Sequence, residues 1–158
     1  MRSRKYPLEA VSRLRDQQVD LAAGELGRST RALEGAQRTR AAAERALEGH
    51  RESAAGLRGA EREALARGEL RAIDLAAGEA WGLGLATEER VLVGNADTAR
   101  DKETQAEVRD REAKVQLATR KVDADGVDKH RARFDQAQRK DAEARDEEAS
   151  SEAWRPKR

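Results

Sequence analysis

The chain has 158 residues, of which 40% are charged and only 3% are aromatic. Leu, Val, Ile and Phe together supply about 15% of the sequence, which is too little bulk to fill the interior of a compact globule. The 32 basic residues nearly balance the 31 acidic ones, so the net charge is +1. Intrinsic disorder usually needs a larger net charge and nucleic-acid binding needs a basic excess, so this balance argues against both. A coiled coil fits, because it buries only a narrow seam.

The first predicted element is a long helix over residues about 8–66. Pro7 suits a first helical position, where its missing N–H costs little. Small and apolar residues then recur at the seven-residue spacing of a coiled-coil seam. One series of seam positions is Val19, Leu26, Leu33, Arg40, Leu47 and Ala54, and its partner series is Ala22, Ser29, Ala36, Ala43, His50 and Leu57. Arg40 and His50 are the flaws in this seam.

A turn is predicted over about 67–73, where Gly68 can end the first helix and Asp74 is a possible N-cap of the second. The second helix is expected over about 74–150, although several glycines leave open whether residues 75–86 are continuous helix. Its seam consists of Leu92, Ala96, Ala99, Ala106, Ala113, Leu117, Arg120, Ala124, Val127 and Phe134. A second, weaker stripe of Val108, Val115 and Val122 is either spare surface or a partner face.

Pairing the two seams locates the turn, because facing residues of an antiparallel hairpin have position numbers with a constant sum. A turn near residue 70 gives a sum near 140 and sets apolar residues against each other, such as Leu57 against Leu83. A turn near residue 78 would instead bury charge, so the first register is favoured. The predicted fold is all-α: two long helices in one antiparallel coiled-coil hairpin spanning residues 1–158.

This register also predicts how the open end of the hairpin is built. Residues after about 135 overhang the first helix without an intramolecular partner. The last buried layers are expected to contain Tyr6, Leu8, Leu14 and Phe134. Arg15 and the overhang through Trp154 are expected to stay free.

The residues that usually carry chemistry are scarce. There is no cysteine, and the two histidines, His50 and His130, lie on different predicted helices. No zinc-ligand cluster and no phosphate-binding loop with its lysine is present in the sequence. Carboxylates are plentiful, but they sit on solvated helical faces. We therefore expect no enzyme activity, cofactor or metal. No apolar run is long enough to span a membrane, which predicts a cytoplasmic protein.

Three short segments resemble the YscO/FliJ family of type III secretion stalk proteins. The first segment is Tyr6-Pro7-Leu8 followed by Leu14-Arg15, the second is Ala72-Ile73-Asp74-Leu75 followed by Trp81, Leu85, Glu88 and Glu89, and the third is Asp146-Glu147-Glu148-Ala149 followed by Trp154. The resemblance covers nearly the whole chain in length and order. Trp81 stands where the family would have Tyr or Phe, and Gly82 and Gly84 after it are a further departure.

The resemblance implies a non-enzymatic stalk that couples a hexameric export ATPase to the export gate in the membrane. The open end of the hairpin would bind the ATPase, through Tyr6, Leu14, Arg15, Trp154 and Arg155. The tip would bind the cytoplasmic part of the gate, through Trp81, Leu85 and Leu92. Some members of the family also bind free export chaperones. No nucleic acid and no direct membrane insertion are implied.

Two other functions are compatible with the same residues. One is a cytoplasmic structural or scaffolding coiled coil without an ATPase partner, which could self-associate through the valine stripe. The other is an escort of export chaperones that does not contact the ATPase.

Overall fold

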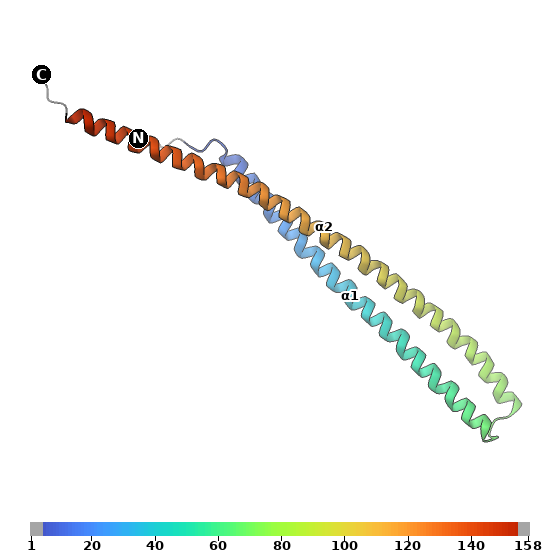
Figure 1. Ribbon diagram of the computed structural model, residues 1–158. Coiled ribbons are helices and arrows are strands. Elements are labelled where there is room, and N and C mark those ends of the chain that lie inside the picture. The colour runs from blue at the N-terminus through green and yellow to red at the C-terminus, as the bar shows by residue number, and fades with distance from the viewer. Residues whose placement is uncertain (1–4, 155–158) are drawn as a thin grey trace. The chain divides into compact units, whose positions relative to one another are not determined.

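The computed structural model describes residues 5–154, and nearly all of them belong to two helices: α1, Glu9–Ala66, and α2, Ala72–Ala153 (Figure 1). The described residues contain no strand. The predicted all-α class is confirmed. Each helix contributes to two compact units. The base unit comprises residues up to Gly27 and from Glu112 onward, and the tip unit comprises Arg28–Arg111, including the turn.

Within each unit the two helices run antiparallel, and ion pairs between them report the register. In the tip unit, Arg40 pairs with Glu103, Arg100 with Glu44, and Arg51 with Glu89; in the base unit, Arg131 pairs with Glu9, and Arg15 with Asp123. The two position numbers of each pair add up to between 138 and 144. The predicted register, with its sum near 140 and its turn near residue 70, is therefore confirmed.

The turn is held by hydrogen bonds at both of its ends. Gly68 has a φ of 69°, and its N–H donates to the Leu65 carbonyl, while the Glu69 N–H donates to the Ala64 carbonyl. This Schellman arrangement needs a left-handed residue, which explains the glycine. At the start of α2, the Asp74 carboxylate accepts a hydrogen bond of 2.9 Å from the Arg71 N–H. Asp74 thus reaches back from the first turn of α2, and its predicted placement as the N-cap residue was wrong.

Helix α2 is continuous through residues 75–86, so the glycines at 78, 82 and 84 do not break it. It starts at Ala72, slightly before the expected position, while α1 starts at Glu9, after Pro7 rather than on it. In the base unit α2 runs past the start of α1. Every described side chain from Arg139 to Glu152 is exposed, as expected for an overhang without a partner.

The seam follows the predicted positions but contains little bulk. Its buried apolar residues are Leu47 and Ala54 on α1 and Ala96, Ala99 and Ala113 on α2. Leu57 is 42% exposed and Leu83 is 72% exposed, so the predicted burial of that pair was wrong. Arg120 also turned out to be exposed. Because most of these buried apolar residues are alanines, hydrophobic burial along the seam is modest.

Glycine substitutions test whether helix propensity limits stability. A Cβ atom added at Gly35 or Gly49 would meet no atom within 4 Å. Gly35→Ala and Gly49→Ala should each raise the free energy of unfolding by about 0.5–1 kcal/mol. Gly68→Ala is the matched control and should lower it by about 1 kcal/mol, because the left-handed φ is strained for alanine. Urea unfolding followed by circular dichroism measures all three, and a destabilised Gly35→Ala would contradict this account.

Candidate partner-binding surfaces

Tyr6 closes the open end of the hairpin in the base unit. It is only 8% exposed, and its hydroxyl lies 2.9 Å from Nδ1 of His130 and 3.3 Å from the Val127 carbonyl oxygen. Its ring packs edge-on against Phe134 with the centroids 5.4 Å apart, and the Arg131 guanidinium lies over it at 5.6 Å. The predicted burial of Tyr6 is thus correct. As a consequence, little of this side chain is available to an ATPase.

The neighbouring residues differ from the expectation. Leu8 is 36% exposed and Leu14 is 51% exposed, so neither forms the predicted buried layer. Arg15 was expected to stay free, and that was wrong: its guanidinium is 3.1 Å from Asp123 and 3.0 Å from the Gln18 side chain. Leu14 therefore offers an accessible apolar surface, while Arg15 is engaged within the unit.

The overhang is followed by the most exposed large hydrophobic side chain of the described residues. Trp154 is 89% exposed and stands directly after α2. A shallow hollow beside it is lined by Asp146, Glu147, Ser150 and Ser151. An indole in this position can pack on a partner without first leaving an intramolecular site. Arg155, assigned to the same surface, lies outside the described residues.

The three residues assigned to the gate are not equally accessible. Trp81 is 56% exposed, whereas Leu85 and Leu92 are half-buried in the seam. The Leu85 carbonyl oxygen accepts a hydrogen bond of 3.0 Å from Nε2 of His50. Other exposed apolar residues of this unit include Leu65, Ile73, Leu83 and Val91. Of the three residues, Trp81 is thus the accessible one, while Leu85 and Leu92 lie in the seam.

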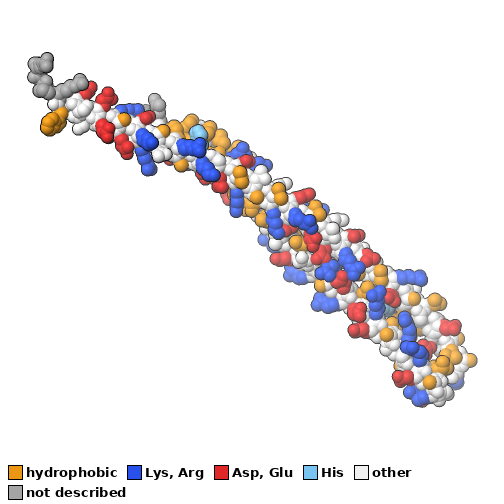
Figure 2. All heavy atoms as spheres, in the orientation of Figure 1, with side chains coloured by type: hydrophobic (Ala, Val, Ile, Leu, Met, Phe, Trp, Pro, Cys, Tyr) orange, Lys and Arg blue, Asp and Glu red, His pale blue; other side chains and the backbone are white. Residues whose placement is uncertain are grey.

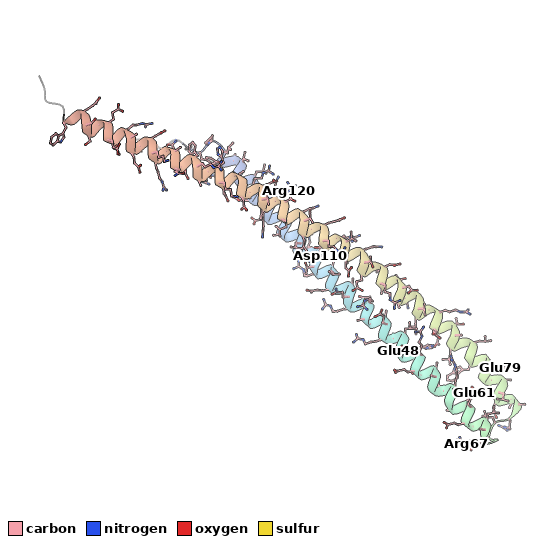
Figure 3. The ribbon with its side chains drawn as sticks, viewed as in Figure 1. Glu48, Glu61, Arg67, Glu79, Asp110 and Arg120 are labelled. Atoms are coloured by element: carbon pink, nitrogen blue, oxygen red, sulfur yellow. The ribbon has the colours of Figure 1, made fainter. Side chains whose placement is uncertain are left out.

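A buried polar layer lies between the helices at Asp110. This residue, labelled on α2 in Figure 3, is only 2% exposed. Its Oδ1 accepts hydrogen bonds from the hydroxyls of Thr30, at 2.8 Å, and Ser29, at 3.3 Å. A buried carboxylate is stable only where such donors reach it. The sequence offered a signal that was missed, since Asp110 falls between Ala106 and Ala113 on the seam face.

A second polar layer surrounds Arg40, one of the two predicted flaws of the seam. The guanidinium binds Glu103 across the hairpin and Glu44 on its own helix, and Glu44 also binds Arg100 at 3.0 Å. The carboxylates of Glu103 and then Glu44 raise the pKa of Arg40 above its ordinary value. The four side chains together form a network that bridges the helices.

A third layer accommodates His50. Because a carbonyl oxygen can only accept, Nε2 carries the hydrogen toward Leu85, which leaves Nδ1 facing the Glu88 carboxylate 3.8 Å away. Next to it, a hydrogen bond from Arg51 lowers the pKa of Glu89 below its ordinary value. That ion pair persists at neutral pH and weakens only as the pH falls through the lowered pKa. Arg40 and His50, the two residues that interrupt the apolar seam, therefore both have polar partners.

No model of a known protein family matches the sequence, and neither the curated proteins nor the solved structures show a significant match. The described residues contain no group of His, Asp or Glu side chains placed to hold a metal ion. Within residues 5–154, neither helix is apolar enough over a sufficient length to cross a membrane.

The Asp110 layer can be tested by separating its polar groups. Asp110→Ala should lower the free energy of unfolding by about 2 kcal/mol, because two hydroxyls lose their buried acceptor. Combining Asp110→Leu with Ser29→Ala and Thr30→Val should cost much less, since no buried polar group is left without a partner. Urea titrations at one protein concentration compare the variants. Equal losses for the single and the triple replacement would show that the carboxylate matters for another reason.

Proposed function

We propose that this protein is a non-enzymatic stalk of a type III export apparatus. Its open end would bind the hexameric export ATPase, and its tip would bind the cytoplasmic part of the export gate. The observation that carries the proposal is the overhang: a stretch of α2 with every described side chain exposed from Arg139 to Glu152, followed by an exposed tryptophan. A helix that emerges alone from a paired base can enter a ring and contact its inner wall.

The charge of the overhang defines the surface that it would meet. Between residues 139 and 152 three basic residues, Arg139, Lys140 and Arg145, are outnumbered by six carboxylates, those of Asp141, Glu143, Asp146, Glu147, Glu148 and Glu152. A matching ATPase surface would be basic, with an apolar place for the Trp154 indole. A single helix inside a ring makes few contacts at a time. Binding is therefore weak and partly electrostatic, and it falls with added salt.

At the tip, Trp81 supports the contact with the gate. Its indole is more than half exposed on the hairpin end where the two helices join, so it can bind without unfolding the seam. Under this proposal the protein works in the cytoplasm, bound peripherally to the inner-membrane export apparatus. It would also be positioned to hand over export chaperones.

A scaffolding coiled coil without an ATPase partner is the second candidate. Exposed apolar side chains on α2 of the base unit favour it: Val115 is 66% exposed and Val122 is 69% exposed. The third member of the predicted stripe, Val108, is 45% exposed and belongs to the tip unit. Association with other helices would bury such residues.

ATP hydrolysis by the cognate export ATPase separates the two candidates. Full-length protein should stimulate hydrolysis at micromolar concentration, and stimulation should decline with salt. Deletion of residues 136–158 should abolish it, while the hairpin stays folded because the described part of the deleted segment is almost entirely exposed. Trp154→Ala should weaken binding severalfold, since an exposed aromatic anchor is lost. Val122→Ala is the control of similar exposure and should stimulate normally. If the full-length protein neither binds nor stimulates the ATPase, the stalk function is excluded and the scaffold remains.

Binding of the gate can be tested at Trp81. Trp81→Ala should weaken binding to the purified cytoplasmic part of the gate about tenfold or more, as expected for a central aromatic contact. Helicity and melting temperature should change little, because the side chain is 56% exposed. Calorimetric titration and thermal melting measure the two effects. A large drop in melting temperature with unchanged affinity would assign Trp81 to hairpin packing instead.

A further inference from the structure

One face of α2 in the tip unit carries no charge, although 40% of the chain is charged. The face runs from Ile73 to Thr98 and consists of residues spaced three, four and seven apart, which share one side of a helix. Three of its members are large and apolar: Ile73, Leu83 and Val91, which are 71%, 72% and 59% exposed. The seam residues Leu92, Ala96 and Ala99 point to the other side of the helix, toward α1. This uncharged face is therefore directed away from the hairpin partner.

The remaining members of the uncharged face are small or have their polar groups occupied. The small members are Ala76, Ala77, Ala80, Gly84 and Gly94, and all five are exposed. Thr87 donates its hydroxyl hydrogen to the Leu83 carbonyl, and Thr98 donates to the Gly94 carbonyl. These two threonines can be covered at little cost, because their hydroxyl donors are already bonded. Asn95 is the remaining polar member.

Large and small residues alternate so that the uncharged face is complementary to itself. If a second copy of α2 lies antiparallel with its two-fold axis near residues 83 and 84, paired position numbers add up to about 167. The resulting pairs are Ile73 with Gly94, Leu83 with Gly84, Val91 with Ala76, and Thr87 with Ala80. Each larger side chain then meets a small one, which lets two helices approach closely.

The flanks of the face fit the same arrangement. The flanks are the two long edges of the uncharged face. When two helices pack antiparallel, each edge lies against the same edge of the other helix. One flank brings Glu79 next to Arg90 of the second copy, twice by symmetry; Figure 3 labels Glu79 on α2 near the turn. Neither residue forms an ion pair with any other described residue of its own chain. These opposite charges are thus available for a pair between copies.

The other flank brings Trp81 next to residues 87 and 88 of the second copy. A shallow hollow lies there, lined by Thr87, Glu88, Val91 and Leu92. Trp81 is 56% exposed and can fill this hollow of the partner. Size, charge and concavity therefore point to the same register. In Figure 2, by contrast, red and blue side chains are interleaved over most of the visible surface.

We propose that the uncharged face of α2 is a self-association surface, on which a second copy of this chain packs antiparallel to form a symmetric dimer. The face spans about 38 Å of helix at 1.5 Å per residue and contains few large side chains, so the dimer is weak. The inference goes beyond the proposed stalk function, which includes no contact between copies, and Trp81 is the one residue that both use. It has one consequence for that function: Trp81 cannot contact the gate and a second copy at the same time.

Sedimentation velocity between about 10 and 500 µM tests the dimer, since a dissociation constant in the micromolar range is expected for a small interface. Gly84→Glu places two carboxylates on the two-fold axis and should weaken dimerisation at least tenfold. Gly126→Glu is the matched control: Gly126 is also an exposed glycine of α2 with no atom near its Cβ position. Both variants should keep or gain helicity, because glutamate favours a helix more than glycine does.

A charge exchange tests the register. Glu79→Arg and Arg90→Glu should each weaken the dimer about two- to fivefold, and the combined variant should restore it. A wild-type protein that is monomeric throughout would overturn the proposal. So would equal effects of Gly84→Glu and Gly126→Glu, or a combined variant weaker than either single one. ATPase stimulation by Gly84→Glu protein should equal that of wild type, which keeps this test independent of the stalk function.

Discussion

The antiparallel pairing of α1 and α2 depends on a seam that contains very little apolar bulk. Alanines supply most of its buried apolar residues, so shifting one helix along the other by a turn would exchange one alanine for another at small cost. Apolar burial alone therefore leaves the register weakly specified. The polar layers at Asp110, Arg40 and His50 supply what the alanines lack, because each loses its partner when the register slips. An unpaired buried polar group such as Asp110 costs more than a lost methyl contact, and the half-buried Arg40 and His50 add contacts across the hairpin, so these layers favour one alignment.

The residues that do not fit the heptad are thus the ones that define the structure. Arg40 interrupts a series of apolar positions, yet it links Glu103 on α2 to Glu44 on α1. Its long side chain lets the charged group reach the edge of the seam, where solvent remains accessible. Asp110 is more deeply placed, and its Oδ1 accepts hydrogen bonds from the hydroxyls of Ser29 and Thr30. Stability and specificity are therefore divided between different residues: alanines allow close approach, and polar residues decide which turns face each other.

The fold could be predicted from the sequence because its cause is periodic. A seven-residue repeat and a single break at Gly68 are local features, and they located the helices, the turn and the register. The details of the candidate surfaces could not be predicted in the same way. Whether Arg15 is free depends on Asp123, and whether Tyr6 is accessible depends on His130 and Phe134, all distant in sequence. Leu14 lies close to Tyr6 and Arg15 in the sequence, but it stands on the outer side of α1 and is 51% exposed.

Many of the large apolar residues of the described chain lie outside the seam. Leu21 and Leu83 are each 72% exposed and Ile73 is 71% exposed, whereas the most deeply buried apolar residue, Ala96, is 1% exposed. Exposed aliphatic residues cost little singly, but several on one uncharged face add apolar area that a partner can cover. The alanines at the buried positions add little bulk, and many of the larger side chains lie outside the seam. The chain thus holds its hairpin with small residues and polar layers, and it keeps much of its capacity for hydrophobic contact for association with other molecules.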